Sequence, residues 1–214
     1  MCGRFVMLTY DEVMDVIRSI EMDAPYNIEP DWPARRPSAY PGSIVPVITE
    51  SEGILEPQNL KWGFETDWQK GLVFNTRIET ALGPKPGMWK KPINEGRCVV
   101  VTAGFFEPHE TETVRSPRSG RQIKRQYLFD AEDDRPTLLA AVRDADAFSI
   151  VTTEPNRIMA PIHKRMPIVL RREEVPIWMD GDFASLADRS GIGLTVRPED
   201  ELNPPATPIQ RSLL

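Results

Sequence analysis

The pattern of apolar and polar positions predicts many short strands and few helices. One helix is expected after a capping box formed by Thr9 and Glu12, where apolar residues repeat with helical spacing. The residues of this apolar face are Val13, Val16, Ile17 and Ile20. A second helix is expected over residues 175–186. The sequence itself therefore indicates a mixed α+β fold rich in strands.

Apolar runs bounded by turn residues mark the expected strands. These strands lie at residues 2–7, 44–48, 53–55, 74–80, 97–101, 127–129, 138–142 and 148–153, of which 44–48 and 53–55 are expected to form a hairpin. In the segment 74–80 the polar residues Asn75, Arg77 and Glu79 alternate, so they would share one face of a strand. Such a polar row either borders solvent at a sheet edge or lines a polar cleft.

Prolines mark the expected loops. Residues 26–40 contain several prolines together with Arg35 and Arg36, which is typical of a surface loop. Residues 156–167 are expected to form a rigid loop around His163, although a single loop histidine is more often a surface residue than a catalyst. We expect one domain over residues 1–202, followed by an extended or disordered proline-rich tail at 203–214.

Composition narrows the class of protein. The chain has 214 residues, 40% of them hydrophobic and 27% charged, which is ordinary for a globular domain. We find no apolar run long enough to span a bilayer, and Asp11 and Glu12 argue against a signal peptide. The only cysteines, Cys2 and Cys98, make neither a disulfide framework nor a metal site. Cys98 is expected to be buried on a strand, and we expect a cytoplasmic protein without metal or cofactor.

The distribution of charge is compatible with nucleic-acid binding at one local face of the protein and not over its whole surface. The formal net charge of −6 argues against binding over the whole surface. Basic residues nevertheless gather at Lys85, Lys90, Lys91 and Arg97, and again at Arg115, Arg118, Arg121, Lys124 and Arg125. Such a face could hold a phosphate backbone, while a solvated loop explains the second group equally well.

Aromatic residues beside the first basic group suit unpaired nucleotides. This segment combines a basic side chain, Lys85, with the apolar side chains of Met88 and Trp89, a composition typical of proteins that bind single-stranded nucleic acid. Trp68 and Trp89 have charged or polar neighbours, which favours a stacking role for them. Trp62 has apolar neighbours, so a core position and a stacking position are both open for it.

The N-terminus offers unusual chemistry. Removal of Met1 would leave Cys2 with a thiol and an α-amine on adjacent carbons, a pair that closes on an aldehyde to give a thiazolidine. An α-amine with a pKa of roughly 7.7–8.0 is far more often neutral at pH 7 than a lysine near 10.4. The alternative is that Met1 stays and Cys2 only begins a strand. Glu107, at the end of a buried strand, is expected to be desolvated, which would raise its pKa toward acid–base range.

Four separated motifs resemble the SRAP family, the SOS response-associated peptidases or abasic-site processing proteins. They are Met1-Cys2-Gly3-Arg4-Phe5, Asn75-x-Arg77-x-Glu79-Thr80 after Trp62-Gly63, Gly104-Phe105-Phe106-Glu107, and His163-x-Arg165-Met166-Pro167. The match spans residues 1 to about 170, and the last forty or so match poorly.

The resemblance implies a single domain with a strongly curved, mostly antiparallel, barrel-like sheet and flanking helices. It implies covalent capture of ring-opened abasic sites in single-stranded DNA. We also expect a monomer that associates with the nucleoid when bound to DNA. By motif position, Cys2 would be the nucleophile, Asn75 would hold the amine and sugar, Glu107 would move protons, and His163 would assist imine chemistry. The implied phosphate contacts are Arg4, Arg77 and Arg165.

The chain departs from the family pattern after Glu107, where Pro108-His109 replaces the usual tryptophan. This change puts the shape of the DNA groove in question rather than the chemistry. Two other interpretations remain open: an N-terminal-nucleophile hydrolase that acts on a peptide or amide, with the amine of Cys2 as base, and a noncovalent single-strand binder with a structural Cys2.

Overall fold

A computed structural model describes residues 2–24, 26, 36–117, 119–132 and 136–202. Met1, the central part of the expected loop with Arg35, and the expected tail at 203–214 lie outside these described residues. No helix in the described ranges is both long and apolar enough to cross a membrane.

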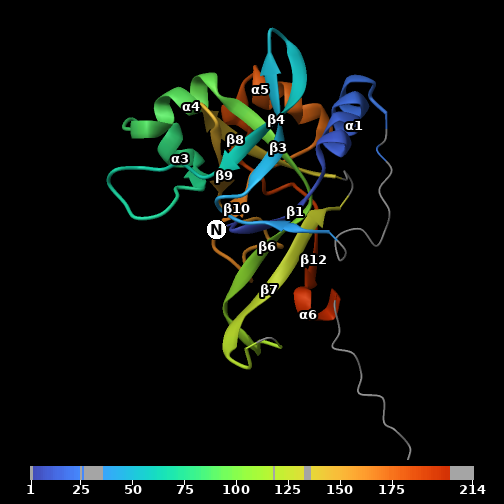
Figure 1. The fold of residues 1–214 in the computed structure, drawn as a ribbon, viewed down its shortest axis with the longest axis vertical. Coiled ribbons are helices and arrows are strands. Elements are labelled where there is room, and N and C mark those ends of the chain that lie inside the picture. The colour runs from blue at the N-terminus through green and yellow to red at the C-terminus, as the bar shows by residue number, and fades with distance from the viewer. Residues whose placement is uncertain (1, 25, 27–35, 118, 133–135, 203–214) are drawn as a thin grey trace, which may run out of the picture.

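Strands dominate the described chain (Figure 1). They are β1 (Arg4–Met7), β2 (Ser38–Ala39), β3 (Ile44–Ser51), β4 (Ile54–Trp62), β5 (Asn75–Arg77), β6 (Arg97–Arg115), β7 (Gln122–Ala131), β8 (Thr137–Asp144), β9 (Ala147–Thr153), β10 (Met166–Pro167), β11 (Val169–Leu170) and β12 (Leu194–Pro198). The expected hairpin of β3 and β4 is confirmed. The strand expected at 74–80 ends at Arg77, so Glu79 lies on a helix and not on the face of Asn75 and Arg77.

The helices are short. They are α1 (Tyr10–Glu21), α3 (Ile78–Ala81), α4 (Lys90–Glu95), α5 (Val175–Met179) and α6 (Glu199–Leu202), with 3-10 turns η1 (Gly87–Trp89), η2 (Arg172–Glu174) and η3 (Phe183–Ala187). The capping box of Thr9 and Glu12 at the start of α1 is confirmed. The single helix expected at 175–186 is wrong, because the chain turns at Gly181, where a Cβ atom would meet the Ile177 backbone at 3.0 Å.

The sheet is strongly curved and closes on itself. β6 pairs with both β3 and β8, and the pairs β3–β4, β4–β9 and β9–β8 complete a ring of strands. Among the described strands every pairing is antiparallel except those of β9 with β4 and β5. The expected curved, mostly antiparallel sheet is therefore confirmed. The hairpin of β6 and β7 projects from the body of the molecule (Figure 1).

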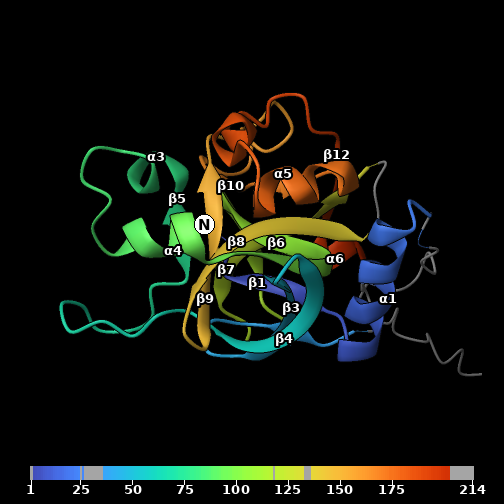
Figure 2. The same cartoon turned by 90° about the horizontal axis from the view of Figure 1, so that it is seen from above.

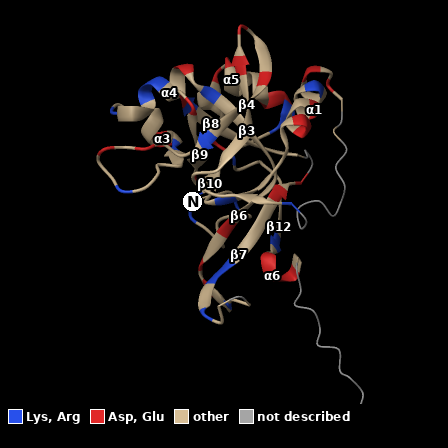
Figure 3. Cartoon of the chain, in the orientation of Figure 1, with Lys and Arg blue, Asp and Glu red and all other residues tan. Residues whose placement is uncertain are grey.

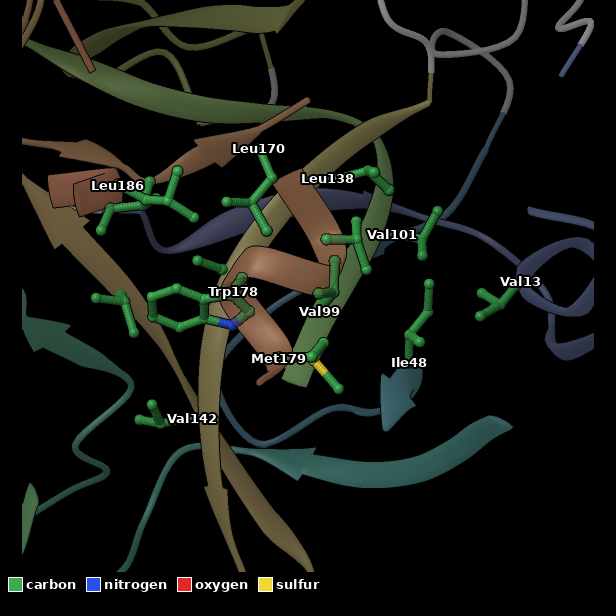
Figure 4. Close-up of a cluster of buried hydrophobic side chains, with 14 of the residues drawn as sticks. Val13, Ile48, Val99, Val101, Leu138, Val142, Leu170, Trp178, Met179 and Leu186 are labelled. Carbon is green, nitrogen blue, oxygen red and sulfur yellow. The ribbon is translucent and has the colours of Figure 1, made fainter. Parts of the chain in front are cut away.

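Two apolar clusters occupy the two faces of this ring. Alternate residues of β6 divide between them: Cys98 and Val100 join one cluster, Val99 and Val101 the other. The second cluster also contains Val13 of α1 and Trp178 of α5, so it lies on the outside, where helices cover the ring (Figure 2). Figure 4 shows Trp178 and its neighbour Met179 within this outer cluster. The cluster with Cys98 fills the inside, which confirms that Cys98 is buried.

Candidate functional site

Cys2 lies at the inner cluster, fully buried. Its Sγ donates to the carbonyl oxygen of Arg4 at 3.8 Å. Burial raises the pKa of the thiol well above its ordinary value, and the negative charge of Glu107 adds to the effect. The thiol is thus protonated at neutral pH, and a neighbouring base must take its proton before sulfur becomes a good nucleophile.

Asn75 holds the backbone of Cys2. It begins β5, which is fixed by parallel pairing with β9, and its Nδ2 donates to the Cys2 carbonyl oxygen at 2.8 Å. The amide oxygen Oδ1 is buried and has no hydrogen-bond partner among the described residues. A buried acceptor of this kind is costly unless something bonds to it. The site therefore presents an acceptor beside Cys2.

Glu107 brings a carboxyl group to the same place. Pairing of β1 with β6 sets Arg4 opposite Phe106, so the chain just before β1 runs beside Glu107. The carboxyl group is inaccessible to solvent, and this burial raises the pKa of Glu107 to about 7. Near neutral pH it is therefore present in both forms and can give or accept a proton.

His163 faces Glu107 from the loop between β9 and β10. Its Nε2 lies 4.0 Å from Oε2 of Glu107, and its Nδ1 lies within 3.2 Å of both the backbone nitrogen and the carbonyl oxygen of Arg165. The ring is thus anchored through Nδ1 in either tautomer. Burial lowers the pKa of His163, which favours neutral imidazole at pH 7.

Asn156 organises the His163 loop, a role that the sequence analysis did not identify. Its buried Oδ1 accepts from the backbone N–H groups of Ile158 and Met159 at 3.1 and 3.0 Å. The carbonyl oxygen of Met159 in turn accepts from the N–H of His163 at 2.9 Å. The signal in the sequence was an asparagine at the start of a loop, where its side chain can cap backbone donors.

Arg165 is held by carboxylates rather than exposed to solvent. It forms two parallel hydrogen bonds with Glu79 at 2.5 and 2.9 Å, and further bonds to Glu154 and to the Thr152 carbonyl oxygen, both at 2.9 Å. Its side chain is only 7% exposed. The phosphate contact expected of Arg165 stays a prediction. In this structure the pair with Glu79 ties the segment after Asn75 to the His163 loop.

Arg4 lies on the other side of β6 from Glu107. Its guanidinium group is 3.8 Å from the centre of the Phe106 ring, and it bonds Glu199 at 2.6 Å and Ser38 at 3.0 Å. Phe106 and Glu107 are consecutive strand residues, so their side chains point to opposite faces. A phosphate at Arg4 would thus lie across the strand from the Glu107 carboxyl group.

The other residues expected to contact DNA divide into exposed and buried ones. Trp68 is 67% exposed and Met88 37% exposed, and the basic residues Arg77 and Lys85 are also exposed. Trp89 is only 8% exposed because its ring packs against Phe64, so its expected stacking role is corrected. Its polar sequence neighbours concealed a contact made by residues distant in the chain. Trp62 is a core residue, with Nε1 bonded to the Phe74 carbonyl oxygen.

In the part of the chain that the structure describes, no group of three or more histidine, cysteine or acidic side chains is placed to hold a metal ion. The arrangement is thus a buried thiol, an amide, a carboxyl group and an imidazole around one point near the N-terminus.

Comparison with known protein families gives a match over residues 1–205 to the family described as SOS response associated peptidase (SRAP). The chain belongs to the SRAP family. The match reaches further than the 170 or so residues over which the motifs are recognisable.

Curated SRAP relatives share about a quarter of their residues with this chain. Abasic site processing protein YedK of Escherichia coli is 28% identical over 190 residues, which cover 84% of this chain and 79% of YedK. Abasic site processing protein YoqW of Bacillus subtilis is 25% identical over 203 residues, 84% of this chain and 80% of YoqW. Abasic site processing protein HMCES of Rattus norvegicus is 26% identical over 196 residues, 74% of this chain and 54% of that protein.

Solved structures share the SRAP fold seen here. A phage-related protein from Bordetella bronchiseptica superposes with a TM-score of 0.65 at 22% identity, over 92% of this chain and 93% of that one. A protein from Bacteroides thetaiotaomicron gives a TM-score of 0.61 at 21% identity, over 99% and 100% of the two chains.

The departure at Pro108-His109 shapes a bulge in this SRAP chain. The pairing of β6 with β7 shifts between Pro108 and Thr113. Within the bulge, Nδ1 of His109 accepts from the N–H groups of Thr111 and Glu112, and Glu110 donates its N–H to the Ile162 carbonyl oxygen at 3.0 Å. The bulge therefore braces the loop that carries His163.

Proposed function

We propose that this protein captures abasic sites in single-stranded DNA covalently, through Cys2 exposed by removal of Met1. The observation that carries the proposal is the meeting of Cys2, Asn75, Glu107 and His163 at one buried point next to the N-terminus. The relatives' names, abasic site processing proteins, indicate the aldehyde of a ring-opened abasic sugar as the reacting group.

The proposed reaction is balanced without an oxidant or a cofactor. The α-amine of Cys2 attacks the aldehyde carbon, and loss of one water gives an imine. The sulfur then bonds to the imine carbon while the thiol proton passes to the nitrogen. The product is a five-membered thiazolidine, and one water is released in total.

Glu107 suits the proton transfers that this sequence needs. With a pKa of about 7, its protonated form can donate to the sugar ring oxygen as the abasic sugar opens. The resulting carboxylate is then available as a base for the Cys2 thiol, whose raised pKa calls for one. Neutral His163, 4.0 Å from Glu107, is a second carrier for imine formation and its reversal.

Asn75 suits the binding of the amine. Its Nδ2 fixes the Cys2 carbonyl group, and its buried Oδ1 lacks a partner among the described residues. An amine or a sugar hydroxyl bound beside Cys2 would satisfy this acceptor. The amide would thus orient the attacking nitrogen before the aldehyde arrives.

The surface residues that fit an unpaired strand are Arg77, Lys85, Trp68 and Met88, all of them exposed. An exposed tryptophan offers a stacking face to any base, and the cations suit phosphates. Arg77 ends the strand that begins with Asn75, so it lies two residues from the site in sequence.

A denaturing gel tests the proposal, because only a covalent adduct survives it. We expect the processed protein to form one heat-stable adduct per chain with an abasic oligonucleotide, and Cys2→Ala to form none, since its α-amine can give only a reversible imine. Cys98→Ala is the matched control, because Cys98 is the other free, buried cysteine. Loss of the adduct in Cys98→Ala, or its persistence in Cys2→Ala, would contradict the proposal.

The family description as a peptidase favours one second candidate, hydrolysis of a peptide or amide by Cys2. A hydrolase releases product repeatedly, whereas covalent capture stops at one adduct per chain. Product released in excess of enzyme from a peptide substrate would therefore favour the hydrolase.

A further inference from the structure

The short helix α6 brings acid to basic side chains at the base of the projecting hairpin. Its first residues are Glu199, Asp200 and Glu201, and Figure 3 shows this acidic helix beside the hairpin of β6 and β7, which carries basic residues. Glu199 bonds Arg4 at 2.6 Å, and the other two carboxylates contact Arg125 of β7. Two cations on different strands are thus covered by one acidic segment.

Arg125 is held in the geometry that guanidinium groups use for phosphate. Its Nε and one terminal nitrogen bond the two carboxylate oxygens of Asp200 at 3.0 and 3.1 Å. The same terminal nitrogen lies 3.2 Å from Glu201, and the other terminal nitrogen lies 3.7 Å from Glu112. Paired, parallel N–H···O bonds of this kind form equally well with a phosphate.

Arg125 lies on the same face of the hairpin as the candidate site. Tyr127 pairs with Glu107 across β6 and β7, and residues two apart on a strand share a face. Two residues along a strand span about 7 Å. The Arg125 guanidinium carbon is 5.5 Å from the centre of the Tyr127 ring, so a cation and an aromatic ring lie together near Glu107.

We propose that Arg125 is a binding site for a backbone phosphate of the strand that carries the abasic site, and that Asp200 and Glu201 occupy it until a phosphate replaces them. This inference rests on the proposed function. The two carboxylates compete with phosphate for Arg125 and so lower the affinity of the protein for single-stranded DNA.

The exposure of the partners makes this exchange feasible. The side chains of Arg125, Asp200 and Glu201 are 25%, 46% and 67% exposed. Ion pairs as exposed as these contribute little to folding and weaken with salt. A phosphate that replaces them also releases counterions from the nucleic acid. Arg125 is therefore held loosely enough to change partners.

The competing explanation is a clasp, in which the same contacts only fasten α6 to the hairpin. A binding experiment separates the phosphate site from the clasp. The full chain binds an undamaged, labelled oligothymidylate, and fluorescence anisotropy measures the affinity over a range of salt concentrations. The test variant is Asp200→Asn with Glu201→Gln. The matched control is Glu52→Gln with Glu56→Gln, which removes the same charge from exposed residues at the β3–β4 hairpin.

We expect the α6 variant to bind the oligonucleotide more tightly than the control variant, with a log–log salt slope steeper by up to about 0.7, the change for one phosphate contact. Adding Arg125→Gln should remove this gain in the α6 variant. Equal affinities of the α6 and control variants, with a lower melting temperature for the α6 variant alone, would overturn the inference in favour of a clasp.

This binding assay, together with the gel assay of the abasic adduct, separates failure of the inference from failure of the proposed function. If the wild-type chain binds the oligonucleotide and forms the abasic adduct, equal affinities remove only the role of α6. If the wild-type chain neither binds nor forms the adduct, both proposals fall. A gain in affinity that survives Arg125→Gln would also overturn the assignment of the phosphate to Arg125.

Discussion

Glu107 stores electrostatic free energy in its buried carboxyl group. Its pKa of about 7 in the folded chain lies above the unfolded reference of about 4.3. The folded chain therefore binds this proton more tightly than the unfolded chain does. The free energy of unfolding must then fall as the pH rises from about 4.3 to about 7, and stay lowered above that window. Such a cost is expected of a group kept for proton transfer.

Glu107→Gln tests this cost directly. We expect the stability of the variant relative to wild type to rise by roughly 1–3 kcal/mol as the pH goes from 4.5 to 8, because the amide carries no charge to bury. Urea unfolding at both pH values measures it, with Glu56→Gln as an exposed control. A stability difference between wild type and Glu107→Gln that does not change with pH would show that the carboxyl group does not titrate near 7.

The pH dependence of adduct formation tests the chemistry of the same residue. The α-amine must lose its proton near pH 7.7–8.0, while Glu107 must keep one below about pH 7. We expect a bell-shaped rate profile with a maximum between pH 7 and 8.

Glu107→Gln should slow adduct formation by roughly 10²–10⁴ and remove the alkaline limb, while loss of His163 should slow it less. Single-turnover gels over a pH series provide the measurement. Wild-type rates in Glu107→Gln would reduce this residue to a structural role.

Elements distant in sequence meet through the pair of Arg165 and Glu79. The bidentate bond joins the His163 loop to α3, directly after the strand that begins with Asn75. Burial tends to raise the pKa of Glu79, but hydrogen bonding and charge from Arg165 outweigh it, so the net pKa is lowered. The ionised pair therefore acts as a brace between two parts of the site.

Glu79→Gln should loosen this brace. We expect a loss of roughly 1 kcal/mol in stability, because Glu79 is half exposed, and slower adduct formation with an unchanged salt slope. Glu154→Gln is the matched control, since Glu154 contacts the same guanidinium group but is 80% exposed. Thermal melts and crosslinking rates at two salt concentrations measure both effects.

Arg165→Lys separates the brace from a phosphate contact. Lysine keeps the charge but cannot form the paired bonds, so we expect it to behave like Glu79→Gln. Wild-type rates in Arg165→Lys would contradict the brace and return Arg165 to the phosphate-binding surface.

The local elements were predictable, and the long-range contacts were not. The capping box of α1 and the β3–β4 hairpin depend on neighbours in sequence, and both were predicted. The burial of Trp89 depends on Phe64, so the polar sequence neighbours of Trp89 misled. The ion pair of Arg165 with Glu79, 86 residues away, left no local signal in the sequence either. The motifs named Cys2, Asn75, Glu107 and His163, which the structure brings together. They did not predict that Arg4 lies across β6 from Glu107.

At the scale of the whole molecule, the ring of strands holds Cys2 in its inner core, with Trp68 and Met88 on the surface. The abasic site of an unpaired strand can reach such a surface without the separation of base pairs. In a duplex, the flanking stack and the complementary strand must be displaced, at a cost of a few kcal/mol.

We therefore expect faster capture of an abasic site in a single strand than of the same site in a continuous duplex. A crosslinking time course on one abasic strand, alone and annealed, makes the comparison, with an undamaged strand as the blank. Equal rates would mean that the protein does not depend on an open strand.

The central claim is that the free aminothiol of Cys2 forms the bond. Intact-mass analysis of the adduct tests it most directly, using the processed chain and a chain with one alanine inserted between Met1 and Cys2. We expect the processed chain to gain the mass of the oligonucleotide less one water, and the extended chain, whose Cys2 nitrogen is an amide, to gain nothing. An adduct on the extended chain, or a mass without the loss of water, would contradict the account.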